Sequence, residues 1–448
     1  MKHLILPLLL LLTFQSAIAQ FSWNAELSLQ GMASTEEEEL PFWMYHNQRG
    51  RIEKETNLVT WISGKAFYDL GKAGLLEAGV GILARDADSD RVFTDELYLT
   101  YKKAWFELTV GRKQRKEVYN GLSASNESIL RSLNTRPLPG IQLKSTRPVF
   151  ILKNFGFEAS WEEYLMDDDR YVNNARLHHK SFQLVYSTAD RNFQVKAGIQ
   201  HFAQWGGDSP SRGSQESFED YLRIFTGRGG GQGAYIGDQQ NALGNHIGGY
   251  ELYLSKTFTN YKVDLIYNHL FEDGSGSRLG NTPDGRYGIF VSSNNSSKLV
   301  NSLMYEFYTT HHQSHTTTGI HKNDDYFNNT GYRSGWTYHR KVLGAPFFTV
   351  NPDGMGIVNN KFTAHHFGIG GNLTSTLGNH PYRLLLSYAQ NDGTRPVRFK
   401  PKQDVFYSML DVKLLQKDIE LNLQLAAEYD SYEAPVYGAG VSLKYRIE

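Results

Sequence analysis

The chain contains no cysteine, which excludes disulfide bonds and thiolate metal sites. Neither sign of charge dominates, because 46 Lys and Arg stand against 47 Asp and Glu, and this balance provides no basic field for nucleic acid. After residue 20 no apolar run approaches the length of about 20 residues that a transmembrane helix needs, and the mean hydropathy is −0.47. A helical membrane protein is therefore excluded. A β-barrel is not, since each of its strands shows only alternate residues to lipid.

The first nineteen residues have the layout of a signal peptide. Lys2 provides a positive start, and the apolar run from Leu4 to Leu12 is broken only by Pro7. Residues 17–19 (Ala-Ile-Ala) then supply the small-x-small pattern of a cleavage site. We expect residues 1–19 to be removed on export and the mature chain to begin near Gln20. An uncleaved anchor helix is the alternative, but the apolar run is short for a bilayer.

The composition favours strands. Aromatic residues make up 13% of the chain, and 42 Gly stand beside only 13 Pro, which suits strands, tight turns and aromatic girdles at a membrane interface. Apolar and polar residues also alternate along many segments, so that each predicted strand has one apolar and one polar face. In one such segment Phe193, Val195, Ala197 and Ile199 interleave with Gln194, Lys196, Gly198 and Gln200.

The pattern predicts an all-β fold, a transmembrane antiparallel β-barrel of about 18 strands formed by one domain, residues 20–448. Short turns alternate with long loops, as in bacterial barrels, and an even number of strands places both termini in the periplasm. The predicted strands are 21–30, 57–69, 75–84, 95–101, 104–111, 140–147, 155–161, 180–187, 193–202, 248–258, 261–270, 299–310, 314–321, 363–374, 381–390, 403–415, 419–430 and 437–447. The predicted long loops are 31–56, 112–139, 203–247, 271–298 and 322–362.

A short helix is expected inside one of these loops. Ser or Asn caps precede Glu127, Ile129, Leu130 and Leu133, so the segment 123–133 has the pattern of a helix that folds into the barrel.

Candidate metal motifs fail on their spacing. Asp86, Asp88 and Asp90 resemble the start of a calcium loop, but Arg91 and Leu97 occupy the positions that require Gly and Glu. Adjacent histidines on a strand point to opposite faces and cannot bind one ion together. We therefore predict no metal and no cofactor. The histidines considered were His178, His179, His311, His312, His315, His321, His365 and His366.

Catalytic motifs are missing as well. The glycine-rich segment 227–233 lacks the Gly-Lys-Ser/Thr and the strand-then-helix context of a phosphate loop. No Gly-x-Ser-x-Gly or His-Glu-x-x-His pattern occurs, and no catalytic residue is predicted.

The long loops place aromatic residues beside Asp, Asn and Arg. Carbohydrate binding uses this mixture, because a flat ring stacks on the C–H face of a sugar while planar polar groups pair with its hydroxyls. The alternative is that these aromatic residues anchor the membrane interface or pack the loops together. The candidate polysaccharide-binding residues are Trp205, Asp208, Arg228, Asp324, Tyr326, Asn328, Trp336 and Tyr338.

An ordered series of segments resembles the capsule-assembly Wzi family of outer-membrane proteins, in the form found in Bacteroidetes-like bacteria. The series spans nearly the whole mature chain. It comprises 41–43 (PFW), 47–50 (NQRG), 95–98 (DELY), 110–114 (VGRKQ), 134–139 (NTRPLP), 177–180 (LHHK), 201–205 (HFAQW), 325–329 (DYFNN), 334–338 (SGWTY), 344–347 (GAPF) and 364–366 (AHH). The resemblance implies an eighteen-stranded barrel whose outer loops bind capsular polysaccharide without catalysis. In better-known members a helical bundle blocks the periplasmic mouth, whereas here a plug must come from 31–56 or 112–139, or be missing.

We therefore expect a non-enzymatic, lectin-like polysaccharide-binding barrel of the Gram-negative outer membrane that acts in capsule assembly or attachment. Its expected partners are capsular or other surface polysaccharide, outer-membrane lipid and lipopolysaccharide, and the barrel-assembly machinery, and not nucleic acid. Two alternatives remain open. One is a porin or channel for sugars or other small solutes, which the polar lumen wall with Glu26, Lys196 and Arg446 would suit equally well. The other is an outer-membrane hydrolase of lipid or glycan.

Overall fold

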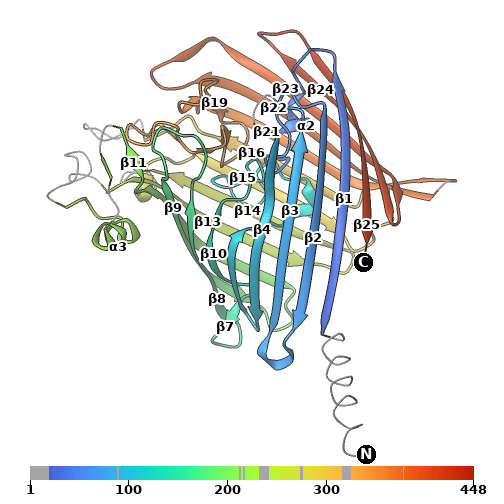
Figure 1. Ribbon diagram of the computed structural model, residues 1–448, viewed down its shortest axis with the longest axis horizontal. Coiled ribbons are helices and arrows are strands. Elements are labelled where there is room, and N and C mark those ends of the chain that lie inside the picture. The colour runs from blue at the N-terminus through green and yellow to red at the C-terminus, as the bar shows by residue number, and fades with distance from the viewer. Residues whose placement is uncertain are drawn as a thin grey trace, which may run out of the picture.

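The computed structural model places the long strands in one closed antiparallel sheet (Figure 1). β1 pairs with β2 on one side and with β25 on the other, which closes the sheet into a barrel. The structure describes residues 20–87, 90–210, 213–214, 217–231, 242–272, 276–314, 324–376 and 378–447.

The sheet contains nineteen strand segments, of which β6 and β7 both pair with β8 and form one interrupted strand, so the barrel has eighteen strands as predicted. Their bounds are β1 Phe21–Ser34, β2 Leu58–Asp69, β3 Leu75–Arg85, β4 Val92–Lys103, β5 Phe106–Arg112, β6 Pro139–Ser145, β7 Val149–Phe150, β8 Phe155–Leu165, β9 Arg176–Ser187, β10 Phe193–Trp205, β13 Asn245–Thr257, β14 Tyr261–Phe271, β15 Gly285–Ser293, β16 Ser302–Thr309, β21 Phe362–Ser375, β22 Gly378–Gly393, β23 Arg398–Gln416, β24 Ile419–Asp430 and β25 Val436–Ile447. The loops contain α2 Phe42–Tyr45, α3 Phe218–Thr226, the 3-10 turns η1 Gly71–Ala73, η2 Tyr119–Gly121 and η3 Gly276–Arg278, and the short pairs β11 Asp208–Ser209 with β12 Gly213–Ser214, β17 Thr337–Tyr338 with β18 Lys341–Val342, and β19 Thr349–Val350 with β20 Ile357–Asn359.

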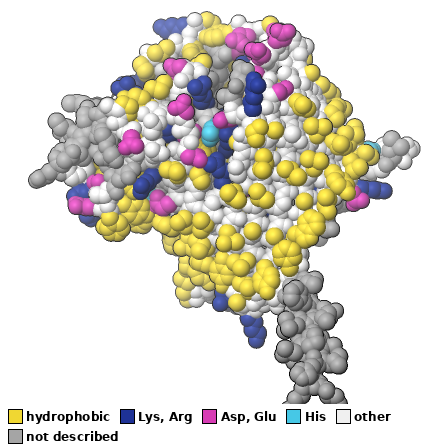
Figure 2. All heavy atoms as spheres, in the orientation of Figure 1, with side chains coloured by type: hydrophobic (Ala, Val, Ile, Leu, Met, Phe, Trp, Pro, Cys, Tyr) yellow, Lys and Arg dark blue, Asp and Glu magenta, His cyan; other side chains and the backbone are white. Residues whose placement is uncertain are grey.

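The alternation in the sequence produces the two faces of the wall. On β9 and β10 the outward side chains are apolar and exposed, as Phe182 (46%), Leu184 (62%) and Ile199 (40%) show, while the residues between them point into the barrel. Figure 2 shows hydrophobic side chains gathered over the outer wall and charged ones mainly at one end. An apolar exterior around a closed hydrogen-bonded ladder is the arrangement that hydrocarbon requires.

The two ends of the barrel differ. At one end the strands are joined by short turns, such as 70–74 and 417–418. The first residue of β1 and the last residue of β25 also lie at this end. The long connections, such as 35–57 and 113–138, lie at the other end as predicted, together with shorter ones such as 394–397 and 431–435. In bacterial barrels short turns face the periplasm and long loops face outside. The long-loop end is accordingly the extracellular end of this barrel.

Three local predictions were wrong although the strand number is correct. β15 occupies residues 285–293, inside the predicted loop 271–298. No barrel strand takes the place predicted for 314–321, because β16 pairs directly with β21. Residue 314 is in a turn, and residues 315–321 lie outside the described residues. The segment 123–133 forms turns and a bridge between Ser128 and Arg131, not a helix. The described loops contain short α-helices elsewhere, α2 and α3.

Loops from the extracellular end fold back into the barrel and fill its interior. We define the plug as residues 35–57, 113–138, 166–175 and 324–361. Both segments predicted as sources of a plug contribute to it, and 166–175 and 324–361 were not predicted to. Its apolar side chains pack with inward-facing barrel residues into one core. The largest fully buried members from the plug are Leu40, Trp43, Met44, Tyr326, Phe327, Trp336, Tyr338 and Phe348.

Aromatic contacts join the plug segments to each other and to the wall. The ring of Phe42 on α2 stacks on Tyr407 of β23 with centroids 3.9 Å apart. Trp336 lies edge-on to Phe202 of β10 at 5.3 Å, and its Nε1 donates to the carbonyl of Leu130 at 2.8 Å. These contacts link residues hundreds of positions apart, so the plug is an integral part of the folded barrel.

A buried ion pair fixes the segment 113–138 to the wall. Arg286 on β15 and Glu306 on β16 are both fully buried, with Nε and Oε1 3.0 Å apart. The Glu306 carboxylate also accepts hydrogen bonds from Ser123 Oγ and from the Ala124 backbone N–H, each at 2.7 Å. Arg286 donates to the carbonyl of Asn126 at 3.3 Å. The pair therefore joins two barrel strands and one plug segment.

We expect Glu306→Gln to destabilise the barrel by about 3–5 kcal/mol, because it leaves the Arg286 guanidinium buried without a counter-charge. The denaturant midpoint of the purified protein in detergent micelles measures this loss. Glu158→Gln is the matched control: Glu158 pairs with Lys196 at 2.7 Å in the lumen, but both side chains are about a quarter exposed. Its loss should stay below about 1 kcal/mol. Equal shifts for the two variants would contradict the assigned role of Glu306.

Candidate functional site

The periplasmic half of the lumen retains two cavities below the plug. One, of about 860 Å³, lies against β3–β6, β8–β10, β13 and β14, and the other, of about 560 Å³, lies against β1 and β21–β25. Their walls carry charges that are paired across strands. Lys196 binds Glu158 at 2.7 Å, and Arg446 and Lys444 bind Glu26 at 3.3 and 3.1 Å. The predicted polar lumen wall is thus present, but its charges neutralise one another.

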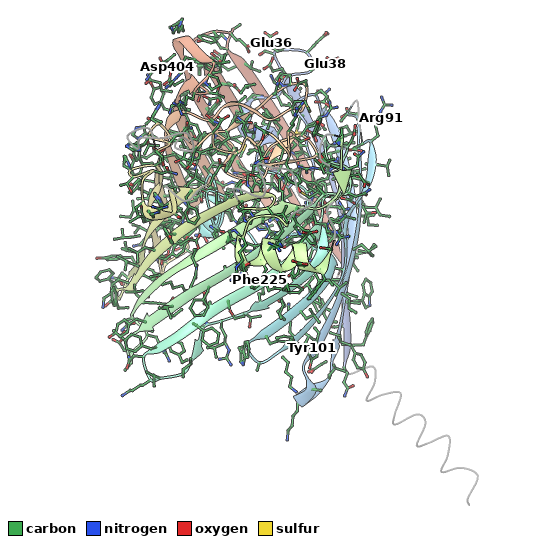
Figure 3. The ribbon with its side chains drawn as sticks, turned by 90° about the vertical axis from the view of Figure 1, so that its left-hand side faces the viewer. Glu36, Glu38, Arg91, Tyr101, Phe225 and Asp404 are labelled. Atoms are coloured by element: carbon green, nitrogen blue, oxygen red, sulfur yellow. The ribbon has the colours of Figure 1, made fainter. Side chains whose placement is uncertain are left out.

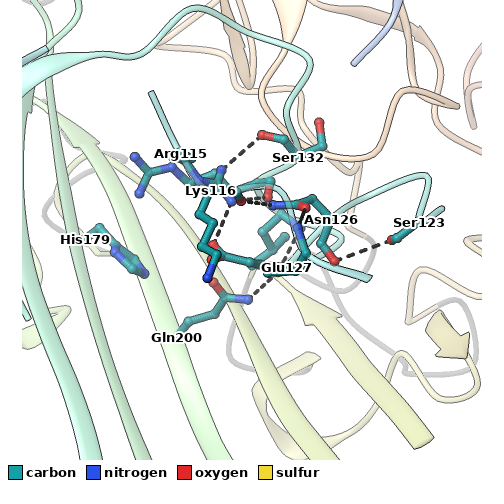
Figure 4. A network of polar contacts seen from close by, with 12 residues as sticks. Arg115, Lys116, Ser123, Asn126, Glu127, Ser132, His179 and Gln200 are labelled. Atoms are coloured by element: carbon teal, nitrogen blue, oxygen red, sulfur yellow. Dashed lines mark hydrogen bonds and ion pairs between the residues drawn. The ribbon is translucent and has the colours of Figure 1, made fainter. Parts of the chain in front are cut away.

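Polar contacts hold the plug segment 113–138 in one shape (Figure 4). Arg115 donates to the Glu127 carboxylate at 2.8 Å and to the carbonyl of Ser132 at 3.0 Å. Asn126 Nδ2 donates to the Lys116 carbonyl at 3.1 Å. Gln200 of β10 donates to Ser128, which ties the same segment to the wall. Side chains thus replace the backbone ladder that a helix would have supplied.

A second set of ion pairs links the plug to the barrel wall near the outer surface. Glu53 of the segment 35–57 binds Arg85 of β3 at 2.8 Å and Lys341 of β18 at 3.0 Å. Burial alone would raise the pKa of Glu53, but Lys341 and Arg85 hold that pKa below its ordinary value. The carboxylate therefore stays charged and joins a barrel strand to two loops.

Five of the eight candidate polysaccharide-binding residues lie in the plug. Asp324, Tyr326, Trp336 and Tyr338 are buried, and Asn328 is half-buried. Their polar atoms are bound within the protein. Tyr326 Oη donates to Asp284 at 3.0 Å, Asn281 donates to Asp324 at 2.5 Å, Asn328 Nδ2 donates to the Ile357 carbonyl at 3.0 Å, and Tyr338 Oη contacts Asp167.

Of the other three, Trp205 is the last residue of β10, and Asp208 and Arg228 lie in the long connection between β10 and β13. Trp205 is buried, with the Arg176 guanidinium 5.1 Å from its ring centre. Asp208 and Arg228 are exposed. The structure therefore does not gather the eight residues into one site, and it leaves these two accessible. That the set binds polysaccharide remains a prediction.

An exposed aromatic–cation pair that the sequence did not indicate lies on the extracellular surface. The guanidinium of Arg333 sits 4.9 Å from the ring centre of Tyr171, joining the loops 166–175 and 324–361. Arg333 is exposed and Tyr171 is half-buried, with its backbone N–H bound to Ser334 Oγ at 2.9 Å. No local pattern signals this pair, because 162 positions separate its members and only the folded plug brings them together.

The hairpin between β22 and β23 forms a basic rim next to two rings, the half-buried Phe399 and the exposed Tyr432. Phe399 and Tyr432 lie 6.4 Å apart at the tips of neighbouring hairpins. Burial and the nearby Arg398 and Arg395 cations lower the pKa of Lys361, and Asp284 and Asp392 oppose this shift. A usable sequence signal existed, since four cations fall between two predicted strands. They are Arg395, Arg398, Lys400 and Lys402.

The described ranges contain no group of three or more His, Asp or Glu side chains placed to hold a metal ion. Asp88 of the rejected calcium motif, and His315 and His321, lie outside those ranges. Across the described part of the chain, no helix is both long and apolar enough to cross a membrane.

Solved outer-membrane barrels share this fold. Wzi of Escherichia coli, an outer-membrane protein involved in group 1 capsule assembly and described as a carbohydrate-binding β-barrel, aligns with a TM-score of 0.60 at 14% identity, covering 96% of this chain and 86% of that one. OccK3 of Pseudomonas aeruginosa aligns with a TM-score of 0.52 at 11% identity, covering 97% and 98%. A BenF-like porin of Pseudomonas fluorescens gives 0.51 at 10% identity, covering 95% and 98%. At these identities the likeness shows the fold, an outer-membrane barrel.

Sequence comparison identifies the family. No curated protein matches the chain. The family model described as capsule assembly protein Wzi matches residues 31–428, which contain fifteen of the eighteen barrel strands in full, all but the last two residues of β24, and all four plug segments. The chain therefore belongs to the capsule assembly protein Wzi family.

Proposed function

We propose that this protein is a non-enzymatic outer-membrane barrel that binds surface polysaccharide and serves capsule assembly or attachment. The observation that supports this most directly is the family match over residues 31–428, together with an extracellular face closed by the plug. The barrel of Escherichia coli Wzi, described as carbohydrate-binding, has the same fold. Outer-membrane lipid, lipopolysaccharide and the barrel-assembly machinery belong to the proposal as partners of any such barrel.

The exposed surface offers the chemistry that sugars need. The ring of Tyr171 can stack on the C–H face of a sugar, and the Arg333 guanidinium beside it presents N–H donors to hydroxyl or carboxylate oxygens. The basic rim adjoins the Phe399–Tyr432 ring pair and suits the anionic groups of an acidic polysaccharide. Asp208 and Arg228 add accessible polar groups.

The filled interior argues against a diffusion channel. A porin keeps a water-filled path through the barrel, whereas here aromatic and aliphatic plug residues pack against the wall across the extracellular half. The remaining cavities lie on the periplasmic side of that core.

The serine–histidine contacts argue against a hydrolase. Ser387 and His366 are hydrogen-bonded at 2.7 Å, but both are buried and the second nitrogen of His366 lies 2.8 Å from the Leu122 carbonyl. Ser375 and His380 meet at 2.9 Å on the surface, yet among the described residues His380 Nδ1 has no hydrogen-bond partner to orient the ring as a base. In neither pair, therefore, is an accessible serine held beside a histidine that a third group orients as a base.

We expect Tyr171→Ala to weaken the binding of purified capsular polysaccharide about fivefold, since loss of a stacked ring costs about 1 kcal/mol. Arg333→Ala should weaken it by a similar factor. Surface plasmon resonance with the folded protein in detergent measures both. Arg191→Ala is the matched control, because Arg191 also stacks on a ring, that of Phe150 at 3.8 Å, but at the periplasmic turn. Polysaccharide binding that is undetectable in the unsubstituted protein would overturn the proposed function, and equal losses in all three variants would overturn the assigned surface.

In planar bilayers the protein should show no steady open-channel conductance, because the plug core blocks the lumen. A variant with residues 334–346 deleted removes Trp336, Tyr338 and the β17–β18 pair and should conduct if it folds as a barrel. Steady porin-like conductance of the unsubstituted protein would favour the channel function instead.

We also propose that residues 1–19 are a signal peptide that is cleaved on export. In support, β1 begins at Phe21, directly after the predicted site. Mass spectrometry of the protein extracted from outer membranes should give the mass of a chain that begins at Gln20. A mass that includes residues 1–19 would contradict this.

A further inference from the structure

Helix α3 lies outside the barrel, against the outer face of its wall. Figure 3 shows the helix crossing in front of the strands, with Phe225 labelled on it. It is a well-formed helix of nine residues: Ser217 caps its start by accepting from the Asp220 N–H, and Gly227 ends it in the left-handed conformation at φ 66°. Loops of the plug turn inward, whereas this one places a helix on the exterior.

The wall beneath α3 is where the outer surface changes from apolar to polar. Phe182 and Ile199 are adjacent outward residues of β9 and β10, and both are exposed. Two residues further toward the extracellular end, the next outward row contains Lys180 and His201, which are again paired. One row higher stand Glu163 and His178. Polar groups therefore begin directly above the lipid-facing rows.

Side chains of α3 cover these polar groups. Tyr221 Oη donates to Glu163 at 2.8 Å and accepts from Trp161 Nε1 at 3.0 Å. The ring of Phe225 lies 5.2 Å from that of His178, and Lys180 Nζ lies 4.0 Å from the centre of the Phe225 ring.

An apolar contact completes the docking of the helix. Ile224 is fully buried in a small cluster with Ala203, Trp205 and Leu243. One side of α3 is therefore fixed to the wall by both apolar and hydrogen-bonded contacts.

A second side of α3 is apolar and exposed. Phe218, Leu222 and Phe225 are spaced i, i+4 and i+7 and form one stripe, with exposures of 75%, 48% and 38%. Glu219 and Arg223 lie roughly a third of a turn around the helix from this stripe and pair at 2.7 Å. Since Phe225 lies over Lys180, the row next to the lipid-facing Phe182 and Ile199, the stripe continues the apolar outer wall.

We propose that α3 is an in-plane interfacial helix whose stripe of Phe218, Leu222 and Phe225 inserts into the acyl chains of the membrane lipid around the barrel. Its position at the apolar–polar boundary, its fixed contact with the wall and its amphipathic sides match a helix that lies at the level of the lipid headgroups. The helix thereby shields Glu163 and His178 from lipid and attaches the β10–β13 connection to the membrane surface. The inference depends on the barrel's place in the outer membrane and does not depend on polysaccharide binding.

Site-specific fluorescence tests this placement, and the absence of native cysteine makes single-thiol variants direct to prepare. Leu222→Cys carries an environment-sensitive fluorophore, and the full chain is reconstituted into phosphatidylcholine vesicles with ordinary or brominated acyl chains. We expect blue-shifted emission and at least a twofold loss of intensity in the brominated vesicles. Leu184→Cys, on the lipid-facing wall, should behave in the same way, and Glu219→Cys should remain water-exposed and unquenched.

A second measurement tests the stripe as a unit. With the fluorophore at Phe218→Cys, an added Leu222→Asp should reduce the quenching by brominated lipid, while an added Arg223→Gln, outside the stripe, should not. A label at 222 that is as water-exposed as the label at 219 would overturn the proposal. A blue shift that is insensitive to brominated lipid and disappears when protein is diluted in the vesicles would overturn it too, because it would identify a second copy of the chain as the occupant.

Discussion

The structure depends on one constraint: backbone N–H and C=O groups that lie in hydrocarbon must all be hydrogen-bonded within the protein. The closed ladder from β1 round to β25 meets this requirement without a free sheet edge. Closure also forces each strand to have one side toward lipid and one toward the lumen, because successive side chains alternate. The apolar exterior and the charged interior both follow from it.

An eighteen-stranded barrel encloses more space than its own wall residues can fill, and here long extracellular loops fill the outer half. Inward charges that would line a water-filled pore are neutralised by partners, from Lys196 with Glu158 in the cavity to Arg286 with Glu306 under the plug. The aromatic residues of the loops become core. The protein thus shares its barrel fold with porins, but its plug closes the extracellular half of the lumen.

The outer surface and the outer wall then serve two different environments. Tyr171 with Arg333, and the basic rim with Phe399 and Tyr432, face the exterior, where a polysaccharide would lie. Helix α3 instead lies on the wall at the boundary between its apolar and polar rows. Aromatic rings beside charged groups thus occur in both places, and their surroundings differ: water at the outer surface and the barrel wall beneath α3.

The sequence by itself determined the barrel, because the alternation of apolar and polar residues along a strand is a local property. It also predicted the number of strands, although it missed β15 and placed a strand at 314–321 instead. Tertiary structure decided the rest. The segment 123–133 has helix-like spacing, but the Ala124 N–H binds Glu306 and the Ser132 N–H binds Leu343, so distant partners replace a helix. Trp336 and Tyr338 have the chemistry of a sugar site, yet contacts with Leu130 and Asp167 bury them. Whether a loop side chain meets water or protein depends on residues far away in the chain, and no local pattern contains that information.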